Sequence, residues 1–140
     1  MSWKIHEFID ERGDRVLATW FRRERVQKKA RILFDQKVDL LVEYGPELPS
    51  ELLAGPVDTH IYKLKVRAQG TQLRPHLCKG PINNQMEYTF LCGAIERDGV
   101  LDPLDVADRA EQNRQLVIAD PSRRLPYERF VPKTARRVSR

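Results

Sequence analysis

The chain has 140 residues, of which 41% are hydrophobic and 32% charged, as is typical of one soluble globular domain with a single core. It has no apolar run near the ~20 residues of a membrane span and no apolar secretion segment at its start, so a cytoplasmic location without membrane contact is predicted. The net charge is +5, and residues 123–140 carry six Arg and one Lys against Glu128, which leaves the preceding part close to neutral. Cys78 and Cys92 lack CxxC or zinc-type spacing, so we predict two reduced thiols and neither a metal nor a cofactor.

The first part of the chain predicts one strand followed by two helices. The strand covers residues 3–9, and the first helix begins after Asp14, which can cap it. A second helix over residues 26–44 has apolar residues at helical spacing and ends at Gly45-Pro46. A basic cluster lies between the helices and on their outer faces, and a solvated surface is favoured over a binding role for it. Its members are Arg22, Arg23, Arg25, Lys28, Lys29 and Arg31.

Residues 61–78, IYKLKVRAQGTQLRPHLC, predict two short strands joined by a turn at residues 68–71. Alternation sorts the side chains onto two faces. One is apolar, with Tyr62, Leu64, Val66, Leu73 and Leu77, and the other carries Lys63, Lys65, Arg67, Arg74 and His76. Symmetric closure places Lys65 opposite Arg74 and Lys63 opposite His76. Because like charges directly across a ladder destabilise a sheet, this second face indicates a polyanionic ligand, and we predict RNA.

The rest of the chain predicts one more strand and one more helix. The strand covers residues 86–94, and the helix begins near Asp102-Pro103, an N-cap followed by proline. From Ser122 onward the chain is rich in Arg and Pro and is predicted to be mobile or ordered only on a partner. The predicted fold is α+β: a small antiparallel sheet covered on one face by two N-terminal helices, with a C-terminal helix and a basic tail. Residues 1–120 would form the domain and residues 121–140 the extension, and the cationic sheet face would be open.

Several short motifs follow one another in a fixed order between residues 14 and 116. They are Trp20, Tyr44-Gly45, Leu48-Pro49, IYKLKV, Gly70 with Leu73-Arg74, EYTFLCGAIER, and Pro103 with Val106 and Ala110. Their order and spacing resemble the RelE/ParE superfamily of bacterial toxins, and within it the HigB-like, phage-derived branch. The resemblance implies a RelE-like fold and the toxin of a type II toxin–antitoxin system. Such a toxin is a metal-independent endoribonuclease that cleaves messenger RNA, often on the ribosome. The implied partner is a cognate antitoxin, a small helix-turn-helix protein through which oligomers form.

The resemblance also implies a set of site residues. By position, Lys65 matches an arginine of a Glu-Leu-Arg strand, Arg74 the arginine usually essential on the following strand, and Arg97 one of two basic residues at the end of the next strand. The implied reaction is attack of the ribose 2′-OH on the adjacent phosphate, with Arg74 and Arg97 stabilising the growing negative charge. His76 is predicted as the acid or base, with a pKa lowered by Lys63 or Lys65. The predicted RNA-binding residues are Lys63, Arg67, Arg123, Arg124 and Tyr127.

Two departures from the family pattern keep alternatives open. Glu96-Arg97 replaces the pair of basic residues, and Pro75, which cannot donate to a ladder, implies a bulge or a sheet edge beside Arg74. The reduced basic pair favours a catalytically inactive RelE-like module that binds RNA or protein. A further alternative is inhibition of a DNA-handling protein, as ParE-like relatives inhibit gyrase.

Overall fold

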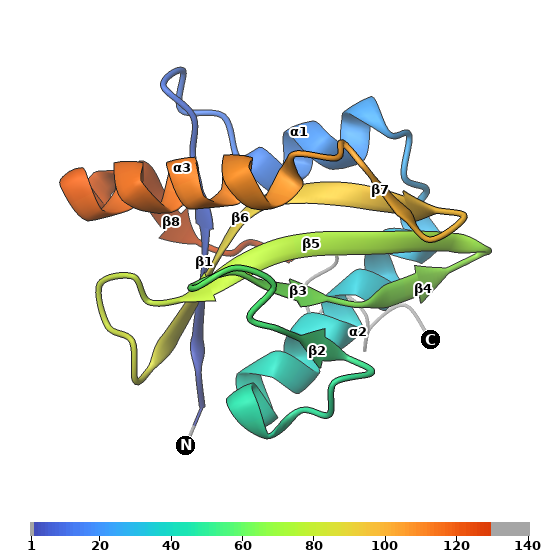
Figure 1. The fold of residues 1–140 in the computed structure, drawn as a ribbon, viewed down its shortest axis with the longest axis horizontal. Coiled ribbons are helices and arrows are strands. Elements are labelled where there is room, and N and C mark those ends of the chain that lie inside the picture. The colour runs from blue at the N-terminus through green and yellow to red at the C-terminus, as the bar shows by residue number, and fades with distance from the viewer. Residues whose placement is uncertain (1, 130–140) are drawn as a thin grey trace, which may run out of the picture.

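A computed structural model describes residues 2–129, and its architecture is a mixed sheet with three α-helices (Figure 1). The helices are α1 (Val16–Arg23), α2 (Lys28–Tyr44) and α3 (Val106–Ala119), with 3₁₀ turns η1 (Gly45–Glu47) and η2 (Pro121–Arg123). The strands are β1 (Lys4–Phe8), β2 (Leu53–Ala54), β3 (Tyr62–Leu64), β4 (Val66–Ala68), β5 (Thr71–Lys79), β6 (Glu87–Arg97), β7 (Val100–Asp102) and β8 (Arg124–Pro126). The predicted α+β class is therefore confirmed.

The sheet differs in pairing from the small antiparallel sheet that we predicted. Its strands follow the order β2-β3-β5-β6-β1-β8, with β4 and β7 paired to β5 and β6. β1 runs parallel to β6, with Lys4 opposite Glu87, and is an interior strand. The prediction of a wholly antiparallel sheet is wrong because strands distant in sequence, which tertiary packing brings together, contribute the parallel pair.

Helices cover both faces of the sheet, so the predicted open face is also wrong. α1 and α2 bury the larger cluster, which includes Trp20, Phe34 and Phe90. On the other face, Ala110 and Val117 of α3 belong to a second, smaller buried cluster. Figure 1 shows α3 in front of the sheet and α2 behind it. The apolar side of α3 therefore packs against the face that carries the hairpin cations.

Residues 124–126 form a strand of the sheet, although we predicted that the chain from Ser122 onward is mobile or ordered only on a partner. β8 pairs antiparallel with β1 and forms an edge. Beyond it, the Tyr127 ring lies 6.0 Å from the ring of Phe34 and 5.8 Å from that of Phe90. The alternating apolar residues Leu125 and Tyr127 are too few to stand out among the basic and proline residues around them. The remainder of the predicted extension, residues 130–140, lies outside the described residues.

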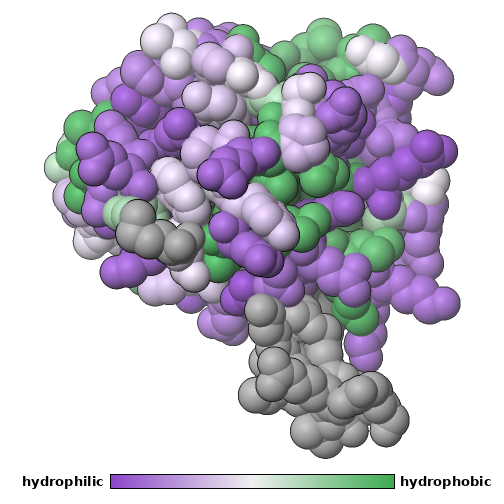
Figure 2. Space-filling model, turned by 90° about the horizontal axis from the view of Figure 1, so that it is seen from below, coloured by the Kyte–Doolittle hydropathy of each residue, from purple (hydrophilic) through white to green (hydrophobic). Residues whose placement is uncertain are grey.

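The predicted irregularity beside Arg74 is present as a shift in register between β5 and β6. Pro75 lies opposite Gly93, and the shift falls between His76 and Leu77. On the surface, the face seen from below in Figure 2 is mostly hydrophilic, with hydrophobic residues between the polar ones. Such a mixture is ordinary for a solvated surface, and by itself it marks no interface.

Candidate functional site

The cations of the predicted hairpin lie along one side of the sheet. β3 and β4 pair with β5 in the same register, with Lys63 opposite His76 as predicted. Lys65 lies between β3 and β4, so the predicted pair with Arg74 is not part of the ladder. Strand alternation places Lys63, Lys65 and Arg67, which we call the hairpin strip, on the side of α3. Arg67 is exposed and the two lysines are half-buried, and none of the three has an ion-pair partner within residues 2–129.

Arg74 lies on the same side of the sheet, but its guanidinium already has partners. Its Nε lies 3.1 Å from a carboxylate oxygen of Glu96. The two remaining nitrogens donate to the side-chain oxygen of Gln72 and to the carbonyl of Leu73, each at 3.0 Å. The Arg74 side chain is only 8% exposed. In the RelE/ParE pattern a basic residue is expected at the position of Glu96. Here the Glu96 carboxylate neutralises Arg74, the arginine predicted to stabilise the phosphate during RNA cleavage.

The His76 side chain, two residues after Arg74 on β5, is fully buried. Its Nδ1 lies 2.9 Å from the carbonyl oxygen of Arg74, so Nδ1 carries the proton of the neutral ring. Its Nε2 is buried and has no hydrogen-bond partner among residues 2–129. Burial lowers the pKa of His76 to about 4, against the effect of the Arg74 carbonyl and with a smaller contribution from the charge of Lys63. The pKa of His76 is therefore lowered, as predicted, but the main cause is burial and not the charge of a lysine. The buried ring is neutral at pH 7.

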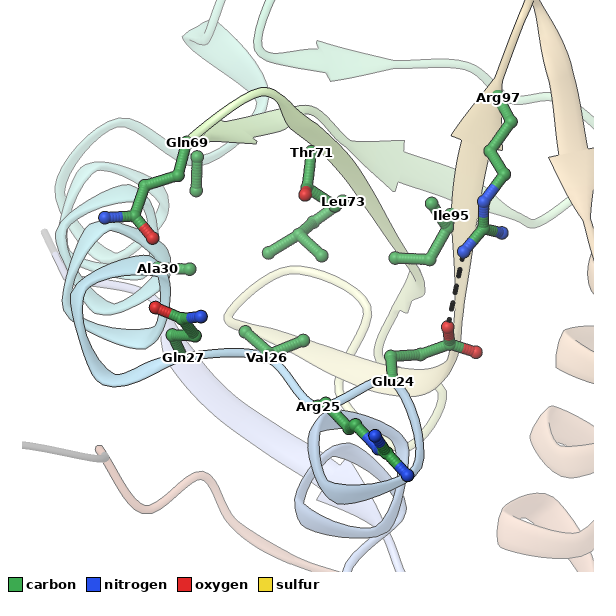
Figure 3. A pocket seen from close by; sticks show the side chains of 11 residues that line it. Glu24, Arg25, Val26, Gln27, Ala30, Gln69, Thr71, Leu73, Ile95 and Arg97 are labelled. Carbon is green, nitrogen blue, oxygen red and sulfur yellow. Dashed lines mark ion pairs between the residues drawn. The ribbon is translucent and has the colours of Figure 1, made fainter.

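Arg97 lies on the other side of the sheet. It follows Glu96 on β6, and it lines a pocket together with the core residue Ile95. Its guanidinium lies 2.9 Å from Asp102 and 3.7 Å from Glu24, the second of which Figure 3 shows. Since neighbouring residues of a strand point to opposite faces, Arg74 and Arg97 do not converge on one phosphate.

The predicted site residues of the tail make structural contacts at the far edge of the sheet. Arg124 forms an ion pair with Glu87 at 2.9 Å, and the guanidinium of Arg123 lies 5.0 Å from the centre of the Phe8 ring. The Tyr127 hydroxyl donates to Asp35 at 2.6 Å, and burial raises the pKa of that hydroxyl. β5, β6 and β1 separate β8 from β3, so these side chains stand apart from the hairpin strip.

The structure also forms a pocket that the sequence did not predict. It has a volume of about 210 Å³ and lies among the α1–α2 connection, the start of α2, the β4–β5 turn and the end of β6 (Figure 3). The sequence offered two signals, the turn at residues 68–71 and the basic cluster around Arg25, but neither indicated that the two segments would meet.

Comparison with protein-family models, with curated proteins and with solved structures finds no match for this chain. Within residues 2–129, no three His, Cys, Asp or Glu side chains gather in a way that would hold a metal ion. Each helix of the same residues is too short or too polar to cross a lipid bilayer. Cys78 and Cys92 are both free thiols, as predicted.

Proposed function

We propose that this chain is the toxin of a type II toxin–antitoxin system, a RelE-like protein that binds messenger RNA in the cytoplasm and cleaves it without a metal. The observation that supports this most directly is the hairpin strip, which lies beside Arg74 on one side of the sheet. A row of cations can bind the phosphates of an RNA backbone, and such contacts position the nucleic acid on the protein. A second support is the chain order β1, α1, α2, hairpin strands, β6 and α3, which agrees with the order predicted from the sequence, although β2, β7 and β8 are additional.

In this proposal, cleavage requires a phosphate to replace Glu96 as the partner of Arg74. Both groups are anions that accept hydrogen bonds from a guanidinium, so the exchange substitutes one charge-assisted bond for another. The 2′-oxygen forms a bond to phosphorus while the bond to the 5′-oxygen breaks, leaving a 2′,3′-cyclic phosphate and a 5′-OH. Solvent takes the proton from the 2′-OH and returns one to the 5′-oxygen. Arg74 and Lys65 stabilise the charge on the non-bridging oxygens, and the enclosed His76 takes no part in proton transfer.

A second candidate is an RNA-binding module without catalysis. The observation that favours it is the pairing of Arg74 with Glu96, together with the burial of His76. An arginine that stays in this pair stabilises the fold and offers little to a phosphate. The hairpin strip would then bind RNA with no cleavage.

Induced expression in a heterologous bacterium separates the two candidates. Growth and messenger RNA 5′ ends are followed for the native chain, Arg74→Ala, Glu96→Gln and Arg12→Ala. Arg12 is an exposed cation in the β1–α1 loop, so Arg12→Ala is the matched control for loss of one charge. The native chain and Arg12→Ala are expected to arrest growth and produce new 5′ ends, and Arg74→Ala to do neither. Glu96→Gln releases Arg74 from its anionic partner and is expected to tighten binding of purified protein to single-stranded RNA about threefold or more.

Other results would point elsewhere. Arrest without new 5′ ends indicates blockade of the ribosome or a ParE-like inhibitor of a DNA-handling protein. A folded native chain that binds RNA and causes no arrest supports the second candidate. Co-expression with a small helix-turn-helix protein from an adjacent reading frame is expected to restore growth and to yield a complex of the two chains.

A further inference from the structure

The pocket in Figure 3 combines an apolar floor with free polar groups at its side. Figure 3 shows the carboxamides of Gln27 and Gln69 beside Ala30, at one side of the pocket. Neither carboxamide has a hydrogen-bond partner within the described part of the chain. Further residues line the pocket: the floor consists of Val26, Leu73 and Ile95, and the hydroxyl of Thr71 adds a third polar group.

Two of the residues that line this pocket hold a backbone conformation that favours glycine. Arg25 has φ 55° and Gln69 has φ 52°. Gln69 and Gly70, with φ 81°, form the two-residue turn between Ala68 and Thr71, where positive φ is required at both positions and Asn-Gly or Gly-Gly is preferred. A non-glycine residue with positive φ is strained, and such residues concentrate at functional sites. Gln69 therefore occupies a turn position that glycine or asparagine would adopt with less backbone strain.

The lining suits a flat, uncharged group with hydrogen-bonding edges. A carboxamide offers a donor and an acceptor side by side, as in the pairing of Asn or Gln with a base edge. The apolar floor can cover the face of a ring. A volume of about 210 Å³ is below the ~300–1,000 Å³ that encloses a whole small-molecule ligand, so the pocket takes one ring of a larger molecule.

Charges at the rim indicate where the rest of that molecule lies. Arg25 is exposed, has no ion-pair partner within the described residues, and extends away from the pocket centre in Figure 3. Lys28 and Lys29 follow on the surface at the start of α2 and are also exposed. Glu24 lies beside Arg25, but its carboxylate forms an ion pair with Arg97, which offsets its negative charge. A phosphate next to the bound ring is therefore expected at Arg25.

We propose that this pocket binds a single nucleobase of single-stranded RNA, with the adjoining phosphate at Arg25. RNA as the source of the base rests on the proposed function, whereas recognition of the base rests on the pocket alone. The site lies on the side of the sheet away from the hairpin strip, so it is a second point of contact with nucleic acid. Gln27 and Gln69 bind the edge of the base, and Val26, Leu73 and Ile95 contact its ring.

Nuclear magnetic resonance of the full, ¹⁵N-labelled chain tests the pocket without any need for cleavage. The probes are the four nucleoside 5′-monophosphates, with inorganic phosphate and ribose 5-phosphate as controls. At least one nucleotide is expected to produce saturable shifts of the backbone amides of Gln27, Gln69 and Thr71, and neither control to do so. Shifts confined to residues outside the pocket, equal shifts from phosphate, or no shifts at all would overturn the proposal.

Substitutions at the turn keep the test clear of folding defects. Gln69→Gly removes the carboxamide and suits the positive φ, so the variant is expected to fold and to bind the nucleotide about fivefold or more weakly. Gln36→Ala removes an exposed carboxamide elsewhere on α2 and is the matched control, with affinity unchanged. Unchanged affinity in a folded Gln69→Gly variant would contradict the proposal.

A labelled single-stranded RNA of about eight nucleotides then identifies the source of the base. The same loss of affinity in Gln69→Gly for RNA and for the mononucleotide supports RNA. A loss for the mononucleotide alone would reassign the pocket to free nucleotides and overturn the RNA part of the proposal. If the native chain binds nucleotides in this pocket but neither arrests growth nor cuts messenger RNA, the proposed toxin function is wrong and the proposed nucleobase site is supported.

Discussion

Acidification is expected to destabilise this protein through His76. The ring is fully buried, and its pKa is lowered from 6.5 to about 4. In the unfolded chain the imidazole binds a proton as the pH falls through 6.5, whereas in the folded chain it does so only near pH 4. Between these values the unfolded state holds more protons, so the free energy of unfolding falls with falling pH. The ring therefore does not affect the free energy of unfolding well above pH 6.5, lowers it progressively between pH 6.5 and about 4, and has no further effect below the folded pKa.

The shift sets the size of the effect. A fall from 6.5 to about 4 corresponds to about 3.4 kcal/mol in the free energy of unfolding. Of this, about 2 kcal/mol is lost between pH ~7.5 and pH ~5. The buried carboxyl of Glu7, whose pKa burial raises, titrates in acid as well and acts in the opposite direction. The effect of His76 must therefore be read as a difference between two chains that both retain Glu7.

Urea unfolding of the native chain and of His76→Gln across this pH range provides that difference. The native chain is expected to lose about 2 kcal/mol more than the variant by pH ~5, because glutamine does not titrate. The proton resonances of the His76 ring provide a second readout, with a midpoint near pH 4 expected. The reasoning from burial would be refuted if the free energy of unfolding had the same pH dependence in the two chains, or if the His76 ring titrated with a midpoint near pH 6.5. The second result would also restore His76 as an acid or base for RNA cleavage.

Two further substitutions test the packing that positions the site. Gly93→Ala is expected to lower the free energy of unfolding by about 1–3 kcal/mol in thermal or urea unfolding, because the added Cβ would overlap the buried Trp20 ring. Wild-type stability would show that α1 is free to move off β6. Tyr127→Phe removes the hydrogen bond to buried Asp35 and is expected to cost about 1.5–3 kcal/mol in the same assay. A change below about 0.5 kcal/mol would mean that the segment after β8 contributes little to the fold.

At the hairpin, the sequence predicts the strand register but not the exposure of the side chains. The register that places Lys63 opposite His76 follows from period-two alternation and the position of the turn, and the structure has that register. The irregularity beside Pro75 follows from a missing N–H group, and the shift occurs next to it. Strand alternation could not predict whether the sheet face that carries the hairpin cations is exposed to solvent. Alternation assigns a side chain to a face of the sheet, but it does not say what packs on that face.

Several features depended on contacts between distant segments. The parallel pairing of β1 with β6 and the addition of β8 to the edge of the sheet join strands that are distant in the sequence. The ion pair of Arg74 with Glu96 joins two strands through side chains that strand pattern alone does not connect. The pocket beside Gln69 needs a turn, two helices and a strand end at one place.

The sequence by itself determined the local elements: two N-terminal helices, a hairpin with its cations on one side, and two free thiols. These follow from spacing, turn residues and composition, which act over a few residues at a time. Only the tertiary structure decided that α3 packs on the cationic side, that His76 is enclosed, and that Arg97 faces away from Arg74. Burial and pairing of charges depend on which distant surfaces meet, and that is a property of the whole fold.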